Sequence, residues 1–182
     1  MASPRQSIEN KCTGERITWI ETARDTGGAL LRFEFTVAPG GRLPVKHLHP
    51  GQSERFELSS GEFCVDLNGQ ERVLKPGETL TIAPGQPHSW RNPSSSEQAR
   101  LIVTFEPALN TETFLEQFFG LANDGKTKPD GTPPFLQIMA MVNRYQLFIA
   151  GPPVFMQRIM GATIGNLARL LGYRAYDPRY SA

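Results

Sequence analysis

Apolar and polar residues alternate with a period of two along the first part of the chain. Residues 31–37 give the clearest example, because their sequence LRFEFTV changes character at every position. Successive side chains of a β-strand point to opposite faces, so this alternation predicts a strand with one buried face. Shorter patterns of the same kind predict strands at residues 17–22, 54–59, 62–68, 71–74, 78–83, 88–91 and 99–106.

Glycine and proline separate these predicted strands at short intervals. The turn sites are Pro39-Gly40-Gly41, Pro50-Gly51, Ser60-Gly61, Asn68-Gly69, Pro76-Gly77 and Pro84-Gly85. Asn68-Gly69 is the strongest hairpin signal, because a tight two-residue turn needs positive φ at both central residues. Many short strands joined by such turns are typical of a sandwich or barrel, so the fold class is predicted to be mainly β.

After Pro107 the apolar residues recur at helical spacing. Asn110 or Thr111 can cap a first helix, whose apolar positions are Phe114, Leu115, Phe118, Phe119 and Ala122. A polar loop at 123–132 precedes two more predicted helices, at 134–149 and 153–171, each opened by proline. We therefore expect a β-barrel over residues 1–107 and a helical extension over 108–182, packed on the barrel or on a dimer partner.

The last two predicted helices are rich in apolar residues, which raises the question of a membrane. A spanning helix needs about 20 largely apolar residues. Arg144, Arg158, Arg169 and a Gly-Pro-Pro break interrupt this stretch, so we expect no transmembrane span. Peripheral membrane contact stays open, because a stripe of apolar side chains lies beside two of these arginines: Phe155, Met156, Ile159, Met160 and Leu167. The alternative is that this stripe packs as ordinary core.

Length, charge and cysteine content narrow the possible partners and locations. A chain of 182 residues and 20.2 kDa suits one domain with an appendage. The formal net charge is +1 and no helix pair carries a basic face, so we expect no nucleic-acid partner. Residues 1–13 lack the apolar segment of a secretory signal, which favours a cytoplasmic location. The widely separated Cys12 and Cys64 do not indicate a disulfide scaffold.

The three histidines of the chain carry the strongest chemical signal. His47 and His49 are two apart, so on an extended strand both imidazoles point to the same face. Glu54 follows after a Pro-Gly turn, and His88 opens a later predicted strand. If a closed sheet brings these four together, their nitrogen and oxygen donors suit one divalent transition metal: iron, manganese, nickel, zinc or copper. The alternative for each histidine is a local hydrogen bond.

Two segments resemble the sequence motifs of the cupin superfamily. Residues 41–61, GRLPVKHLHPGQSERFELSSG, are similar to the first cupin motif in both glycines, both histidines and the glutamate. Residues 77–92 are similar to the second motif through Gly77, His88 and Asn92, although Ala83 stands where the family usually has proline. The resemblance covers about residues 30–106, with the core motifs at 41–92. It implies a single cupin, or jelly-roll, β-barrel that binds a metal through His47, His49, Glu54 and His88.

Inward-facing residues near these positions are candidates for a substrate pocket. Phe56, Leu58 and Trp90 share the parity of Glu54 or His88, so they could form an apolar pocket around the metal. They could equally be plain barrel core. Asn92 is expected to fix a turn and Glu57 to face solvent.

The resemblance suggests several functions, because cupins with this ligand set include dioxygenases, isomerases, decarboxylases and proteins that only bind a small molecule. Our leading hypothesis is a metal-dependent dioxygenase-type enzyme acting on a small organic substrate. If all three histidines bind metal, proton transfer falls to metal-bound water or to Glu54, the only catalytic candidate. The alternatives are a non-catalytic sensor or small-molecule-binding protein, and a structural homodimer with a vestigial site. A homodimer is expected in any case.

Overall fold

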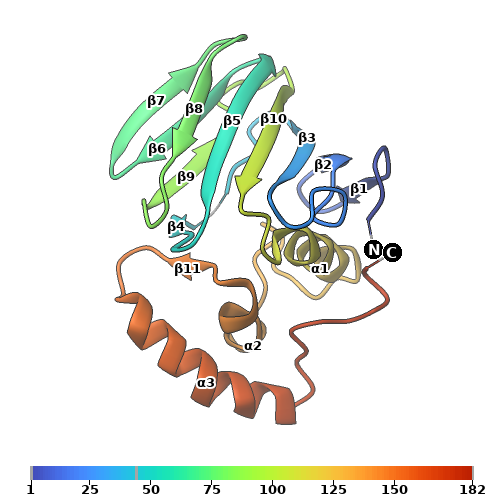
Figure 1. The fold of residues 1–182 in the computed structure, drawn as a ribbon, viewed down its shortest axis with the longest axis vertical. Helices are drawn as coiled ribbons and strands as arrows, with labels where there is room; N and C mark the ends of the chain where they lie inside the picture. The colour runs from blue at the N-terminus through green and yellow to red at the C-terminus, as the bar shows by residue number, and fades with distance from the viewer. Residues whose placement is uncertain (1, 44, 182) are drawn as a thin grey trace.

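The fold consists of two antiparallel sheets that face each other, with three helices below them. The computed structural model describes residues 2–43 and 45–181, so Met1, Pro44 and Ala182, which fall within the motif and domain ranges above, lie outside it. Figure 1 shows the sheets forming the upper body of the molecule and the helices following at one end. The predicted fold class, mainly β with C-terminal helices, is confirmed.

The first sheet contains six strands. Their spatial order is β1 (Ser7–Asn10), β2 (Glu15–Glu21), β3 (Leu31–Val37), β10 (Ala99–Glu106), β5 (Ser53–Ser60) and β8 (Thr79–Ile82). The inward positions of β3 are all buried, as the alternation predicts. Their core partners include Trp19, which meets the Phe33 ring edge-on at 5.5 Å between centroids. Aromatic pairs of this kind add packing energy beyond the burial of their area.

The second sheet contains five shorter strands. Their order is β11 (Phe148–Ile149), β4 (His47–Leu48), β9 (His88–Arg91), β6 (Phe63–Leu67) and β7 (Gln70–Leu74). The hairpin turn predicted at Asn68-Gly69 joins β6 to β7, and both residues have positive φ. The two sheets share one core, in which Phe63 of this sheet packs against Phe56 of the other with ring centroids 5.2 Å apart.

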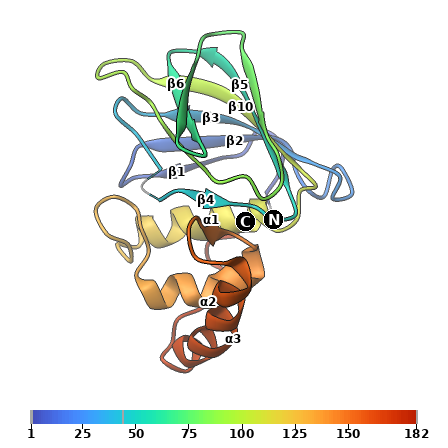
Figure 2. The same ribbon diagram turned by 90° about the vertical axis from the view of Figure 1, so that its left-hand side faces the viewer.

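The three helices are stacked below the sheets, as Figure 2 shows from the side. α1 (Thr111–Asn123) lies next to the sheets and contributes Phe119 to their core. α2 (Phe135–Tyr145) and α3 (Val154–Leu170) follow, and α3 packs closely on α2. A Cβ atom at Gly165 would lie only 2.4 Å from the Met139 carbonyl oxygen, so glycine permits this approach. Among the described residues, no helix combines the length and apolar character needed to cross a bilayer.

Several boundaries differ from the sequence prediction. The helix predicted at 134–149 ends at Tyr145, because Gln146 adopts a left-handed conformation with φ 51°. The chain then turns back, and β11 pairs with β4 beside His47. The short β1, which pairs with β2, was also missed. Asn110 does occupy the N-cap of α1, but its side chain makes no capping bond and instead donates to the Arg144 carbonyl at 3.2 Å. Both cysteines are free, as expected.

Candidate metal centre

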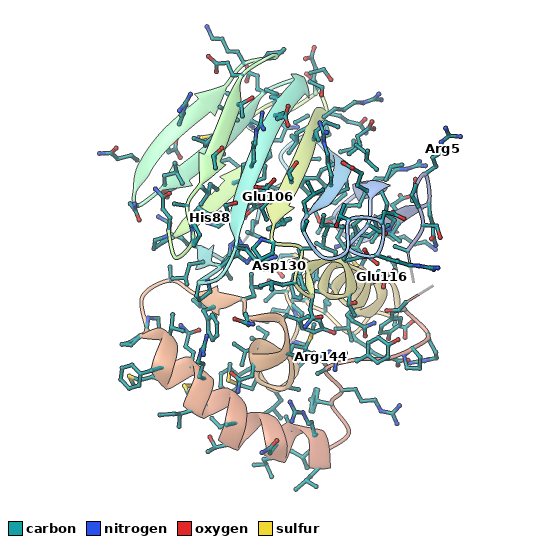
Figure 3. All side chains as sticks on the ribbon, viewed as in Figure 1. Arg5, His88, Glu106, Glu116, Asp130 and Arg144 are labelled. Carbon is teal, nitrogen blue, oxygen red and sulfur yellow. The ribbon has the colours of Figure 1, made fainter. Side chains whose placement is uncertain are left out.

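The two sheets bring the three histidines and Glu54 together. His47 in β4 lies directly opposite His88 in β9, so the second sheet supplies these two side chains as a cross-strand pair. Glu54 comes from β5 of the first sheet, where its neighbours across the strands are Ile82 and Phe105. In Figure 3, His88 lies near the end of the sheets that faces the helices. The cluster therefore bridges the two layers.

The distances within the cluster match donors that face a common ion. The Nε2 atoms of His47 and His49 are 3.0 Å apart, and the Nε2 atom of His88 is 2.9 Å from a Glu54 carboxylate oxygen. Two ligand atoms about 2.1 Å from one metal ion and at right angles would be separated by about 3.0 Å. One ligand atom from each of the four residues lies within 4.8 Å of every other. The buried cluster of three histidines and one glutamate is therefore consistent with one metal ion.

The protonation states of the cluster also favour a cation. Burial lowers the pKa of His47 well below its usual value, and the neighbouring His49 and His88 lower it further, so this imidazole is neutral. Burial alone would raise the pKa of Glu54, but hydrogen bonds from His49 and His88 outweigh it and lower that pKa. Glu54 is thus an anion among imidazoles in a site shielded from water. Such a charge is stabilised by a bound cation.

Contacts with residues outside the cluster orient two of its histidines. The Nδ1 atom of His88 lies 3.0 Å from the Gln86 carbonyl oxygen, which accepts a hydrogen bond from it and leaves Nε2 to face the cluster. A partner of this kind fixes the tautomer and ring orientation of a metal-binding histidine. The ring of His49 packs edge-on against Phe105, with centroids 5.4 Å apart.

The sequence analysis missed one residue that holds the cluster in place. Gln52 is buried, and its amide nitrogen donates to the carbonyls of Pro107 and Ala108 and to the Thr111 hydroxyl, at 2.8, 3.0 and 2.8 Å. These bonds tie the turn between His49 and Glu54 to the start of α1. The sequence pattern does not indicate this role, because a polar residue next to Gly51 in a turn is expected to be exposed.

The cluster opens into a cavity of about 200 Å³ that extends toward the helices. His47, His49 and Glu54 form part of its wall, together with mostly apolar side chains from both sheets, α1 and α2. Of the predicted pocket residues, Phe56 and Trp90 lie on this wall. Leu58 is buried in the core between the sheets and is not among the described residues of the wall. Contact of any of them with a substrate stays a prediction.

Two further carboxyl groups, those of Glu15 and the exposed Asp130, lie on the cavity wall. Glu15 at the start of β2 is buried, and the Thr13 hydroxyl donates a 2.9 Å hydrogen bond to it. Burial raises the pKa of Glu15 to about 7, although the bond from Thr13 opposes this shift. Glu15 can therefore hold a proton near neutral pH inside a mostly apolar cavity. The sequence did not indicate this burial, because Glu15 is a charged residue just before the strand predicted at 17–22.

Two residues near the motifs behave as expected. The Asn92 side chain donates to the carbonyls of Val37, Ala38 and Glu97, so it fixes the turns around it. Glu57 faces away from the cluster side of β5 and lies 3.8 Å from the Arg32 guanidinium.

Comparison with known proteins supports the fold and gives distant relatives. The family model described as "Cupin domain" matches residues 33–105. An oxidoreductase of Arthrobotrys oligospora is 26% identical over 159 residues, which cover 78% of this chain and 60% of that protein. The epoxidase atD of Aspergillus terreus is 24% identical over 153 residues, covering 76% of this chain and 47% of the relative. The chain thus spans about half to three fifths of the length of the curated relatives it matches.

Solved structures show the same fold at low sequence identity. An RmlC-like cupin from Shewanella frigidimarina is 23% identical with a TM-score of 0.50, over 62% of this chain and 94% of that one. Ectoine synthase from P. lautus is 16% identical with a TM-score of 0.50, over 64% of this chain and 79% of that one.

Proposed function

We propose that this chain, a member of the cupin superfamily through its Cupin domain at residues 33–105, is a metal-dependent oxygenase-type enzyme for a small apolar organic molecule. The observation that carries the proposal is the position of the buried cluster. Three of its four residues, His47, His49 and Glu54, also form the wall of an apolar cavity. A ligand in that cavity would therefore lie beside the metal position.

The residues of the cluster have the donors that a catalytic metal requires. The Nε2 atoms of His47, His49 and His88 and a Glu54 carboxylate oxygen would hold the ion. A redox-active divalent metal bound there would supply Lewis acidity and a route for electrons in the oxidation of an organic substrate.

The side chains of the wall would bind and orient the substrate. Phe56, Trp90 and Phe105 present aromatic surface to the cavity, which favours an apolar, ring-containing molecule and excludes water. The three histidines are engaged in the cluster, so none is free as a general base. Glu15, a buried carboxyl group on the described cavity wall, would hold or accept a proton there, because its pKa is about 7.

The relatives support the oxidative class but not a particular substrate. Their names are oxidoreductase, epoxidase and probable oxidoreductase, the last from Aspergillus niger at 25% identity. Each is longer than the region matched, so its substrate does not transfer to this chain. Two other functions compete with the proposal: a small-molecule sensor that does not turn its ligand over, and a structural protein with a vestigial site.

Oxygen consumption after metal reconstitution tests the proposal. The purified chain is loaded anaerobically with ferrous iron and mixed with a panel of phenols, diketones and polyketide-like compounds. We expect oxygen uptake with at least one compound class and none in the Glu54→Ala variant. Glu57→Ala is the matched control, because it lies on the same strand outside the cluster. A compound that raises the melting temperature without oxygen uptake would favour the sensor, and an absence of metal binding would favour the vestigial site.

A further inference from the structure

The side of α3 that faces away from α2 is largely apolar, although Thr163 and Asn166 are also exposed on this helix. Figure 1 shows α3 at the lower edge of the molecule, with α2 between it and the sheets. Its buried side is formed by Gln157, Gly161, Gly165 and Ala168. The remaining surface carries six large apolar side chains that are 47–85% exposed: Phe155, Met156, Ile159, Leu167, Leu170 and Leu171. We call these six residues the α3 outer face. Contiguous exposed apolar surface of this kind usually marks a binding site.

The segment that contains α3 is positively charged, in contrast to the rest of the chain. Residues 131–182 contain five arginines and a single acidic residue, Asp177, which gives this segment a formal charge of +4. Residues 1–130 carry a formal charge of −3. The net charge of the whole chain is therefore close to zero because a negative segment and a positive segment nearly cancel. The positive segment contains α2 and α3.

The two arginines of α3 have uncharged neighbours. Arg169 donates to the Asn166 side chain at 2.8 Å and to the Ala140 carbonyl at 3.3 Å. The guanidinium of Arg158 lies over the Phe148 ring, 5.6 Å from its centroid. Both arginines are exposed. These contacts position the guanidinium groups beside the apolar face but leave their charge free to attract an anionic surface.

We propose that the α3 outer face docks on an anionic phospholipid surface, with α3 lying in the plane of the interface. Interfacial helices combine an exposed apolar face with flanking Lys or Arg, and each basic residue near an anionic leaflet adds to binding. The helix is about 25 Å long, enough to bury both ends of the face in the headgroup region. A second copy of the chain fits less well, because symmetric pairing of the same face would bring like charges together.

Docking in this way places the cavity near the bilayer. α2, on which α3 packs, contributes Ile138, Met141 and Val142 to the cavity wall. It would then lie between the lipid surface and the cluster. Because apolar small molecules concentrate in membranes, the docked chain would take its substrate from the bilayer. This last consequence rests on the proposed function, whereas the docking itself does not.

Vesicle sedimentation with the full chain tests the docking. One set of vesicles is pure phosphatidylcholine, and the other has equal parts of phosphatidylcholine and phosphatidylglycerol. We expect sedimentation with the phosphatidylglycerol vesicles that weakens at high salt, and little with phosphatidylcholine alone. The double variant Ile159→Ser with Leu170→Ser should bind at least about tenfold more weakly, because it lacks two exposed apolar side chains that the lipid interface would bury. Arg158→Gln with Arg169→Gln should reduce binding and its dependence on salt.

Controls separate loss of docking from loss of folding. Val73→Ser removes an apolar side chain of similar exposure, 51%, from β7, and should bind vesicles like the unmodified chain. All variants should keep the circular dichroism spectrum and metal content of the unmodified chain. The proposal is overturned if neither vesicle type sediments the chain, or if Ile159→Ser with Leu170→Ser binds as well as Val73→Ser. It is also overturned if that double variant abolishes a dimer seen in light scattering while vesicles bind neither form.

Discussion

The Nε2 atom of His88 lies 2.9 Å from a carboxylate oxygen of Glu54, although the two residues are 34 positions apart and belong to different sheets. This contact exists only because β5 and β9 face each other across the core. A polar contact in that position is costly to bury unless it is fully satisfied. Two further histidines, His47 and His49, lie beside this buried contact. A cluster of four polar side chains is typical of a binding site rather than of an apolar core.

Gln52 should stabilise the fold more than an ordinary loop residue. Gln52→Ala removes four hydrogen bonds: three that the amide nitrogen donates, and one that the amide oxygen accepts from the Thr111 hydroxyl at 3.1 Å. The Pro107 carbonyl and the Thr111 hydroxyl then lose these partners. We expect the free energy of unfolding to fall by about 3 kcal/mol. Urea denaturation measures this change, with Gln70→Ala at the exposed start of β7 as the control. Equal free energies of unfolding for the two variants would show that the hydrogen bonds of Gln52 do not stabilise the fold.

Glu15 should make stability depend on pH in a defined direction. Its pKa is raised from 4.5 to about 7 in the folded chain, chiefly by burial. Below pH 4.5 the carboxyl is protonated in both states and costs nothing. As the pH rises from 4.5 to 7, the unfolded carboxyl ionises while the folded one stays protonated, so up to about 3 kcal/mol of stability is lost, and the loss is complete above the folded pKa. Glu15→Gln should remove this loss.

The measurement is chemical denaturation of both proteins at acidic and alkaline pH. Glu15→Gln should exceed the unmodified chain in stability at alkaline pH and match it at acidic pH. Glu62→Gln, at an exposed position, should show no such difference. A Glu15→Gln effect that is the same at every pH would mean that the carboxyl does not titrate as described.

Gly61 at the end of the first motif should be less tolerant of substitution than Gly69. Both have positive φ, 81° and 90°, so alanine strains the backbone at either position. At Gly61, however, an added Cβ would lie 2.4 Å from the Gln98 carbonyl oxygen, whereas at Gly69 it would meet nothing within 4 Å. We expect Gly69→Ala to cost about 1 kcal/mol and Gly61→Ala about 2 kcal/mol more. Paired thermal melts test this, and equal losses would contradict it.

Local patterns in the sequence predicted most of the sheet. The alternation in β3 and the turn residues around β6 and β7 depend only on neighbouring residues. The boundaries of these strands could therefore be predicted from the sequence. β11 could not, because Phe148 and Ile149 extend an apolar helical pattern and become a strand only by pairing with β4. The end of α2 likewise depends on Gln146 adopting φ 51°, which glutamine rarely does without tertiary contacts.

The candidate site was predictable to a similar degree. His47, His49, Glu54 and His88 were found because their spacing reflects strand geometry and matches a known motif. Gln52 and Glu15 were missed, because their burial results from contacts with distant segments, at Thr111 and across the cavity. The stripe of Phe155, Ile159 and Leu167 was expected to pack against the barrel or across a dimer, or to contact a membrane. It does not pack against the barrel, because Gly161 and Gly165 turn the opposite side of α3 toward α2. Packing across a dimer stays a prediction.

Metal content is the most direct test of the central claim that four side chains from two sheets hold one ion. Elemental analysis is applied to the unmodified chain, to His47→Ala with His49→Ala, to Glu54→Ala, and to Glu57→Ala as the matched control on the same strand. We predict one equivalent of a divalent transition metal in the unmodified chain and in Glu57→Ala, and loss of most of it in the other two variants. Metal content that is unchanged in His47→Ala with His49→Ala would contradict the account.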